Sequence, residues 1–418
     1  MKTLYLLIML CTINLWTTAQ SGTWKHYNVA NSGLPSDYIR AIVQENDSIY
    51  WIGTNAGAVR YNGHQWTVFS KANSGLPGNN VRSIVIDGRD KWFGTLGGGI
   101  AKFDDSVWTV YDTANSPLPD NNVLHVSMDK GGSLWIGVAG DYLNGNYGGA
   151  TRFDKVNQWT NYIPSNSGIA STNVRYVEAS DTNEIWFGTT GGVSKMAGNV
   201  WTTYNTANSP LPYDDVRGIA RDAHNNLWFG TYSGGGPTGG IAKYDHTHWT
   251  VYDTSNSSLL ANSVAEILVD RCNNIWCGSY YLHRFDGNTW LRYDTANSII
   301  DNYSVFAFAE DNHNNIWIGT FGGILMFEND CFVDPLAVEE SEPDLIITIY
   351  PNPSCGVVNI SSPAKIDHIR VWDLSGRLMS ETMPNASNTT LNIDAGGIYF
   401  AAISTTAGTV VRKLVVGK

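Results

Sequence analysis

Histidines are the residues of this 418-residue chain best suited to acid–base or metal chemistry at neutral pH, and there are nine of them. Only His246 and His248 are spaced to share one element, and their segment, Asp245-His246-Thr247-His248, is more typical of an exposed turn than of a metal site. The chain has no Gly-x-Ser-x-Gly, no His-Glu-x-x-His and no phosphate-binding glycine loop. We therefore predict no catalytic residues, no bound metal and no cofactor.

Arginine recurs near the start of one predicted strand in four repeats, at Arg40, Arg82, Arg175 and Arg217. We expect these strands to line a central channel, so that the four guanidinium groups form a ring. Guanidinium groups bind carboxylates and sulfates through paired hydrogen bonds. The ring is therefore a candidate site for the acidic group of a sugar.

A second candidate site lies in three loops that follow a Trp-x-Gly strand. Residues 138–149 and 231–240 are enlarged relative to the repeat, and a shorter third loop carries two consecutive tyrosines. Tyrosine rings stack on sugar faces, and neighbouring amides and carboxylates bind sugar hydroxyls. The predicted ligand-binding residues are Asp141, Tyr142, Tyr147, Tyr232, Tyr280 and Tyr281.

Two tryptophan motifs mark the elements that must position these residues, and each occurs seven times. A Trp-x-Gly strand stands at Trp51, Trp92, Trp135, Trp186, Trp228, Trp276 and Trp317, and a Trp-x-x-Tyr or Trp-x-x-Phe strand at Trp24, Trp66, Trp108, Trp159, Trp201, Trp249 and Trp290. Copies of the first motif are 41 to 51 residues apart, a period typical of a four-stranded propeller blade. We predict an all-β fold, a seven-bladed β-propeller with four strands per blade.

The phase of the two motifs predicts how the ring closes. The chain begins with a Trp-x-x-Tyr strand, whereas the repeat of Trp317 has none after it. The strand Trp24–Tyr27 is therefore expected to complete the last blade. The glycine two residues after each Trp-x-Gly tryptophan, such as Gly53, is expected to let the next blade approach closely.

Composition changes divide the chain into four predicted parts. Residues 1–19 are typical of a cleaved signal peptide, 20–330 form the propeller, 331–344 an acidic proline-flanked linker, and 345–418 a small β-sandwich. The formal net charge of −12 argues against nucleic acid as a partner, and no later stretch is apolar enough for a membrane span. Cys272 and Cys277 are close enough for a local disulfide, although small packed residues are the favoured interpretation.

The tryptophan strands, the connector Asn31-Ser32-Gly33-Leu34-Pro35 and its copies resemble the two-component regulator propeller repeat over residues 22–328. In that family such propellers are extracytoplasmic sensors of oligosaccharides in hybrid histidine kinases. This chain has a single ring with neither membrane span nor kinase, so it is not expected to signal by itself. The ring arginine belongs to the repeat consensus of that family, which favours a structural role for it.

The C-terminal part resembles the sorting domain of the type IX secretion system of Bacteroidota. The motifs that carry this resemblance contain Pro351, Asn352, Pro353, Gly356, Asp373, Gly376, Gly397, Tyr399 and Lys413. The resemblance implies that the type IX secretion machinery is a partner. It also implies export through the periplasm to the outer surface or the medium.

These observations favour a secreted or cell-surface binding module, without catalysis, for a glycan or protein ligand. One alternative is a propeller enzyme of the lyase type, similar to streptogramin lyase, which uses a histidine and a metal at the channel. For this alternative the candidate histidine is His125, which lies early in the first strand of its blade. A structural or adhesive surface protein is the other alternative.

Overall fold

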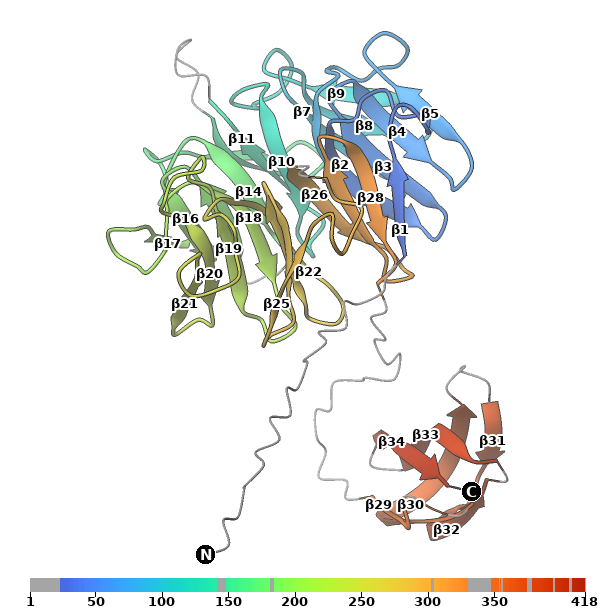
Figure 1. Cartoon of the computed structure of the whole chain (residues 1–418). Coiled ribbons are helices and arrows are strands. Elements are labelled where there is room, and N and C mark those ends of the chain that lie inside the picture. Colours follow the sequence, from blue (N-terminus) through green and yellow to red (C-terminus); the bar gives the residue numbers. More distant parts are fainter. Residues whose placement is uncertain are drawn as a thin grey trace, which may run out of the picture. The chain divides into compact units, whose positions relative to one another are not determined.

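The computed structural model describes residues 23–140, 148–180, 184–301, 304–329, 347–352, 354, 356–373, 378–393, 395–405 and 408–417. The chain divides into two compact units, residues 1–331 and 332–418, and within the described ranges both are built from strands (Figure 1). Five of the predicted site residues lie outside the described residues: Asp141, Tyr142, Tyr147, Pro353 and Gly376.

The first unit contains seven four-stranded antiparallel sheets, which confirms the predicted seven-bladed propeller. Blades 1 to 3 are β2 (Ile39–Asn46), β3 (Ile49–Thr54), β4 (Gly57–Tyr61) and β5 (Trp66–Phe69); β6 (Val81–Asp87), β7 (Asp90–Thr95), β8 (Gly99–Phe103) and β9 (Trp108–Tyr111); and β10 (Val123–Met128), β11 (Leu134–Val138), β12 (Gly149–Phe153) and β13 (Trp159–Tyr162). Blades 4 and 5 are β14 (Val174–Glu178), β15 (Ile185–Thr189), β16 (Gly192–Ala197) and β17 (Val200–Tyr204); and β18 (Val216–Arg221), β19 (Leu227–Thr231), β20 (Gly240–Tyr244) and β21 (Trp249–Tyr252). Blades 6 and 7 are β22 (Val264–Val269), β23 (Ile275–Ser279), β24 (Leu282–Phe285) and β25 (Trp290–Tyr293); and β26 (Val305–Glu310), β27 (Ile316–Thr320), β28 (Gly323–Phe327) and β1 (Trp24–Tyr27).

The ring closes as the phase of the motifs predicts, because β1 pairs antiparallel with β28. Trp24 lies opposite Phe327 and Tyr27 opposite Ile324 in this register. Tyr27 also stacks on Trp317 with ring centroids 6.0 Å apart. The first strand of the propeller thus completes the blade of the last three strands, and β28 is paired on both sides.

The Trp-x-Gly strand packs each blade against the next one. Trp51 is completely buried, and its cluster includes Val81 and Phe93 of blade 2. Gly53 lies on the same face, and a Cβ atom there would stand 2.8 Å from the backbone oxygen of Val81, closer than real Cβ contacts allow. A Cβ atom at the equivalent glycine of every other blade would stand within 3.0 Å of the first residue of the next inner strand, at its backbone oxygen or its side chain. The motif therefore sets the spacing between blades.

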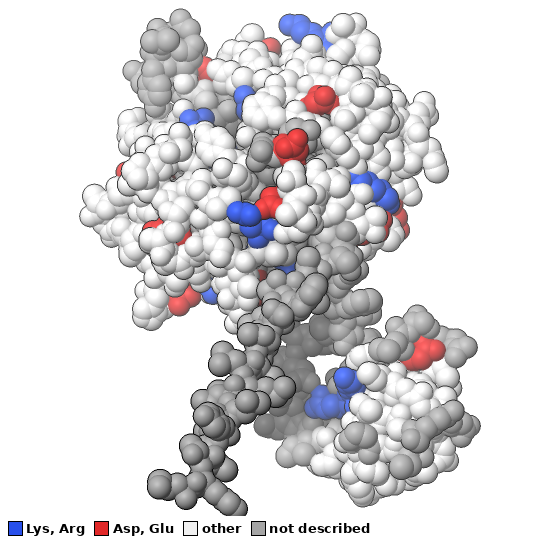
Figure 2. Space-filling view, in the orientation of Figure 1, with Lys and Arg blue, Asp and Glu red and all other residues white. Residues whose placement is uncertain are grey.

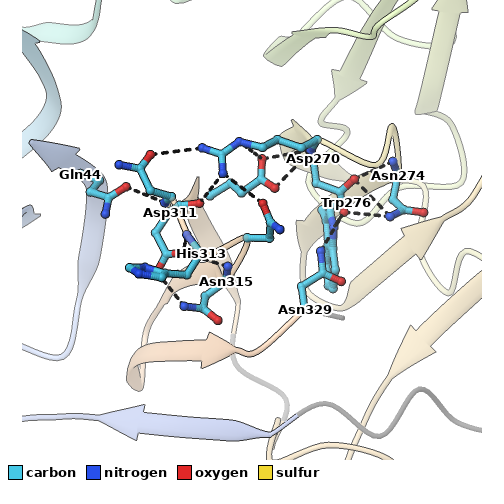
Figure 3. Close-up of polar contacts among 12 residues, drawn as sticks. Gln44, Asp270, Asn274, Trp276, Asp311, His313, Asn315 and Asn329 are labelled. Carbon is cyan, nitrogen blue, oxygen red and sulfur yellow. Dashed lines mark hydrogen bonds and ion pairs between the residues drawn. The ribbon is translucent and has the colours of Figure 1, made fainter. Parts of the chain in front are cut away.

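A repeated carboxylate clamp holds the turn between the first two strands of a blade (Figure 3). In blade 7, Asp311 accepts hydrogen bonds from the backbone N–H of Asn315 and from the indole N–H of Trp317, both at 2.9 Å. Asp270 makes the same contacts in blade 6. Arg271 joins the two turns, since its guanidinium donates to the Asp311 carbonyl at 3.0 Å. These aspartates stabilise turns at the end of the propeller opposite to the loops that follow the Trp-x-Gly strands.

The structure excludes the local disulfide between Cys272 and Cys277. Cys277 is free and completely buried in the cluster between blades 5 and 6, which confirms it as a small packed residue. Cys272 is disulfide-bonded, so the interpretation as a small packed residue is wrong for it.

The second unit is one six-stranded antiparallel sheet of β29 (Thr348–Tyr350), β30 (Val357–Asp373), β31 (Leu378–Thr382), β32 (Ala386–Asn392), β33 (Gly397–Thr405) and β34 (Gly408–Val416). The 17-residue strand β30 pairs with β32 through its first half and with β31 and β33 through its second. Side chains from both halves, including Val358 and Ile369, share one buried core. The single sheet therefore folds over itself into two layers.

Candidate functional site

Every inner strand of the propeller has a β-bulge at its second residue. In blade 1, Ile39 pairs with Thr54 and Ala41 with Gly53, which leaves Arg40 as an extra residue between them. The other six inner strands shift register at the same place. A bulge turns a side chain away from the regular alternation of the strand. The seven bulged residues are Arg40, Arg82, Leu124, Arg175, Arg217, Ala265 and Phe306.

These bulged side chains line a cavity of about 360 Å³ at the mouth of the central channel, with Tyr38, Tyr232, Glu266, Tyr280 and Phe321 also on its wall. The four arginines that the sequence places on a ring are all among them. Three of these arginines, Arg40, Arg82 and Arg175, have a buried Nε atom without a hydrogen-bond partner. The ring therefore offers donors that the described residues leave unused.

Burial and mutual repulsion perturb the titration of the ring. Desolvation, together with the charge of Arg82, lowers the pKa of Arg40 to about 10. Burial also lowers the pKa of Arg82 and of Arg175. Arginine side chains are cationic at neutral pH, so the channel mouth holds several positive charges in close proximity.

Two carboxylates partly balance this charge. Asp215 accepts two hydrogen bonds from Arg217, at 2.8 and 3.1 Å, and lies 3.4 Å from Nε of Arg175 in an ion pair without hydrogen-bond geometry. Glu266 also lines the cavity, and desolvation raises its pKa to about 8 despite the opposing effect of Arg40 and Arg217. Glu266 is therefore largely neutral at pH 7, and the ring keeps an excess of positive charge.

Aromatic side chains form one wall of the mouth. The Arg40 guanidinium lies 4.0 Å from the ring centroid of Tyr38 and 4.4 Å from that of Phe306. Phe321 meets both rings edge to face, at 4.1 and 4.6 Å, and is 46% exposed. Stacked arginines and aromatic rings restrict one another's rotamers. This wall therefore holds Arg40 in place and presents an aromatic surface to solvent.

The loop tyrosines of blades 5 and 6 form a neighbouring wall. The guanidinium carbon of Arg217 lies 3.5 Å from the ring centroid of Tyr232. The Tyr232 hydroxyl lies 3.1 Å from that of Tyr280. Tyr281 lines a separate hollow of about 210 Å³ beside Arg292 instead. The structure therefore brings Tyr232 and Tyr280 to the arginine ring and leaves Tyr281 outside it.

The residues of the mouth that are missing from the sequence-based prediction include its aromatic wall and its acidic side chain: Tyr38, Glu266, Phe306 and Phe321. Phe306 occupies the bulge position in blade 7 that arginine takes in four other blades. Alignment of the repeats could therefore have found it. Glu266 stands one residue after the bulge and has no arginine of its own blade beside it, so no repeat signal marks it.

His125, on the inner strand of blade 3, is held by two residues of blade 4. Its Nδ1 accepts a hydrogen bond from the backbone N–H of Val177 at 3.3 Å, so the proton of the neutral ring is on Nε2. Tyr176 stacks on the ring at 3.9 Å, and burial lowers the pKa of His125 to about 4. In the described part of the chain, no three His, Cys, Asp or Glu side chains are grouped to hold a metal ion.

His246 and His248 do not form a pair of metal ligands either. His246 makes a 2.7 Å hydrogen bond with the Asn225 carbonyl, and His248 is mostly exposed beside Asp245. On the described part of the face in Figure 2, acidic and basic side chains are scattered among uncharged ones. Within the described ranges, no helix is long and apolar enough to span a membrane.

The sorting-domain motifs come together in the second unit. The Asn352 side chain donates to the Lys413 carbonyl at 2.7 Å and accepts from the Val415 N–H at 2.8 Å. Tyr399 is buried and donates to the Ala395 carbonyl at 2.8 Å. The remaining described motif residues occupy sheet positions or turns: Pro351, Gly356, Asp373 and Gly397. The motif that contains Asn352 is thus hydrogen-bonded to the last strand, β34.

Comparisons with known families agree with both units. The model described as two component regulator propeller matches residues 33–56, 210–233 and 298–322, and the secretion system C-terminal sorting domain matches 348–417. The chain carries regulator propeller repeats and a type IX secretion sorting domain. This sorting domain indicates export to the cell surface or secretion. No curated protein matches the chain.

Solved structures share the fold of this propeller-repeat protein at low sequence identity. The extracellular domain of a hybrid two component system from B. thetaiotaomicron has 17% identity and a TM-score of 0.61, over 95% of this chain and 58% of that one. PorZ, a surface component of the type IX secretion system of Porphyromonas gingivalis, has 17% identity and a TM-score of 0.56, and the match covers 94% of this chain and 61% of PorZ. Virginiamycin B lyase from Staphylococcus aureus has 16% sequence identity and a TM-score of 0.57, and the match covers 73% of this chain and 98% of the lyase. The chain thus spans about three fifths of the first two, and these identities establish the fold alone.

Proposed function

We propose that this exported propeller is a non-catalytic binding protein that captures an anionic group of a glycan or protein ligand at the mouth of its channel. The observation that carries the proposal is the convergence of four arginines from four blades on one cavity, with three buried Nε atoms that have no hydrogen-bond partner among the described residues. Export places such a site where extracellular glycans and proteins are the available ligands.

Electrostatics favour an anion over a neutral ligand. Burying a cation is costly unless it is paired. Among the described residues, Asp215 binds Arg217 through two hydrogen bonds and forms an ion pair with Arg175, so one carboxylate serves two of the four arginines. A purely structural arginine would be expected to have a partner for each buried donor. A carboxylate or sulfate in the cavity would supply acceptors to the unused donors and relieve the repulsion within the ring.

Preorganisation supports the same conclusion. Tyr38 and Phe306 hold Arg40, and Asp215 with Tyr232 holds Arg217, before any ligand arrives. Fixing these long side chains in advance reduces the entropy that a ligand must overcome. The exposed aromatic ring of Phe321 adds a surface on which a ring-shaped part of the ligand can stack.

Titration calorimetry of the full chain with glucuronic acid, glucose 6-sulfate, glucose and a peptide with a free carboxyl terminus tests this function. We expect an acidic probe to bind and glucose not to bind. Arg82→Met and Arg175→Met should each weaken binding by about 10-fold or more, because each removes a charged hydrogen-bond donor worth about 1.5–3 kcal/mol.

Arg89→Met provides the matched control, since Arg89 is 81% exposed on a turn outside the cavity and the change in net charge is the same. Equal weakening by all three variants would mean that overall charge, rather than the ring, determines binding. Release of a new product from any probe would contradict the assignment of a non-catalytic role.

A further inference from the structure

We infer that the ligand is an acidic oligosaccharide, whose acidic residue lies on the arginine ring and whose neutral neighbour lies in a second hollow beside it. This inference rests on the proposed function. The second hollow has a volume of about 540 Å³ and is lined by Thr190, Thr206, Tyr213, Asp214, Asp215, Arg217, Tyr232, Ser233 and Gly234.

The two hollows share a wall. Arg217 and Tyr232 line both of them, and they pack face to face at 3.5 Å. Asp215 holds the guanidinium from the other side, and the Tyr280 hydroxyl lies 3.1 Å from that of Tyr232. A ligand that reaches from the ring into the second hollow must therefore cross this wall. Both volumes fall within the range of about 300–1,000 Å³ that is usual for small-molecule sites.

The second hollow has the opposite electrostatic preference from the ring. Among the described residues that line it, Arg217 is the one cation and is already bound to Asp215, and Asp214 adds a further carboxylate. Asp214 accepts from the Thr206 N–H at 2.8 Å and from the Thr206 hydroxyl at 3.2 Å, and its oxygens retain further acceptor capacity. A second acidic group would be repelled here, whereas hydroxyl groups of the ligand can donate. The contrast orients a ligand that is acidic at one end and neutral at the other.

The chemistry of the lining favours a sugar over a peptide. Hydroxyl side chains of Thr190, Thr206 and Ser233 surround the hollow, and Tyr213 is 37% exposed. Sugars bind to such sites through hydroxyl pairs and by stacking on tyrosine. No Val, Leu, Ile or Met is among the described residues that line the hollow, so they offer no pocket for an apolar residue next to a peptide carboxylate.

Titration calorimetry of the full chain tests this inference with glucuronic acid, a panel of aldobiouronic acids that carry glucuronic acid on a neutral sugar, and cellobiose. At least one aldobiouronic acid should bind about 10-fold or more tightly than glucuronic acid. Tyr213→Ala should remove most of that gain and leave the affinity for glucuronic acid unchanged. Arg175→Met should weaken binding of both acidic probes.

Tyr281→Ala is the matched control, because Tyr281 is also 37% exposed but lines the separate hollow beside Arg292. It should change neither affinity. The inference is overturned if no disaccharide binds more tightly than glucuronic acid, if Tyr213→Ala weakens both probes equally, or if a peptide carboxylate binds more tightly than every disaccharide. In each of these cases anion capture at the ring would stand, whereas failure of every acidic probe to bind would overturn both proposals.

Discussion

Lys91 allows a sharp test of how the first two blades are held together. Its side chain is completely buried, and its Nζ lies 3.1 Å from Oε1 of Glu45 in blade 1 and is also paired with Asp105. At this separation the attraction between Lys91 and Glu45 is about 5 kcal/mol for an effective dielectric constant of about 20, before the cost of desolvation. Removing one partner of a buried pair leaves a buried uncompensated charge and costs about 3–5 kcal/mol. We therefore expect Lys91→Met to lower the free energy of unfolding by about 3–5 kcal/mol.

Urea unfolding followed by tryptophan fluorescence measures this effect, and Lys102→Met is its control. Lys102 lies in the same blade 3.2 Å from Asp90, but both side chains are roughly a quarter to a third exposed, at 26% and 31%. An ion pair of this kind contributes about 0–1 kcal/mol. The double variant Lys91→Met/Glu45→Gln should recover part of the lost stability. Equal losses for Lys91→Met and Lys102→Met would refute the reasoning.

Three further predictions concern closure, blade spacing and pH. Deleting residues 20–31, which include the closing strand, should abolish cooperative thermal unfolding of the propeller in calorimetry, and an unchanged transition would contradict closure by that strand. Gly53→Ala should lower stability by about 1–3 kcal/mol in urea unfolding, because the new methyl group overlaps Val81, and a loss below about 0.5 kcal/mol would show that the blades can separate freely. Because Glu266 has a raised pKa of about 8, its protonated form is favoured in the folded protein; its contribution to stability is complete below about pH 4 and is lost as the pH rises to about 8. Affinity for an acidic probe should likewise fall between pH 7 and 9 as Glu266 becomes negative beside Arg40 and Arg217. Glu266→Gln should remove this fall, and a fall of the same size in that variant would contradict the role of Glu266.

The architecture could be predicted because it depends on repetition. Seven copies of two tryptophan motifs determine the blade number, and the unmatched copy at Trp24 determines how the ring closes. The role of Gly53 also follows from its position two residues after Trp51, on the same face of the strand. In each case a regular period of the strand carries the inference.

The site could be predicted only in part, because it depends on departures from regularity. The bulge at Arg40 has no sequence signature, since strand alternation alone would place Arg40 opposite to Ile39 and Ala41. The second hollow depends on Tyr213, which belongs to a connector and looks like an ordinary turn residue in the sequence. Lys91 occupies a position where Leu or Ile precedes the tryptophan in five other blades, and its burial depends on Glu45 of a different blade.

Capture of an anion by the arginine ring is the central claim, and a crystal structure of the full chain with the tightest-binding acidic probe tests it most directly. The account predicts the acidic group in the channel mouth, with its oxygens about 2.7–2.9 Å from guanidinium nitrogens of Arg40, Arg82 or Arg175. An occupied site elsewhere on the propeller, with the three arginines unchanged, would contradict it.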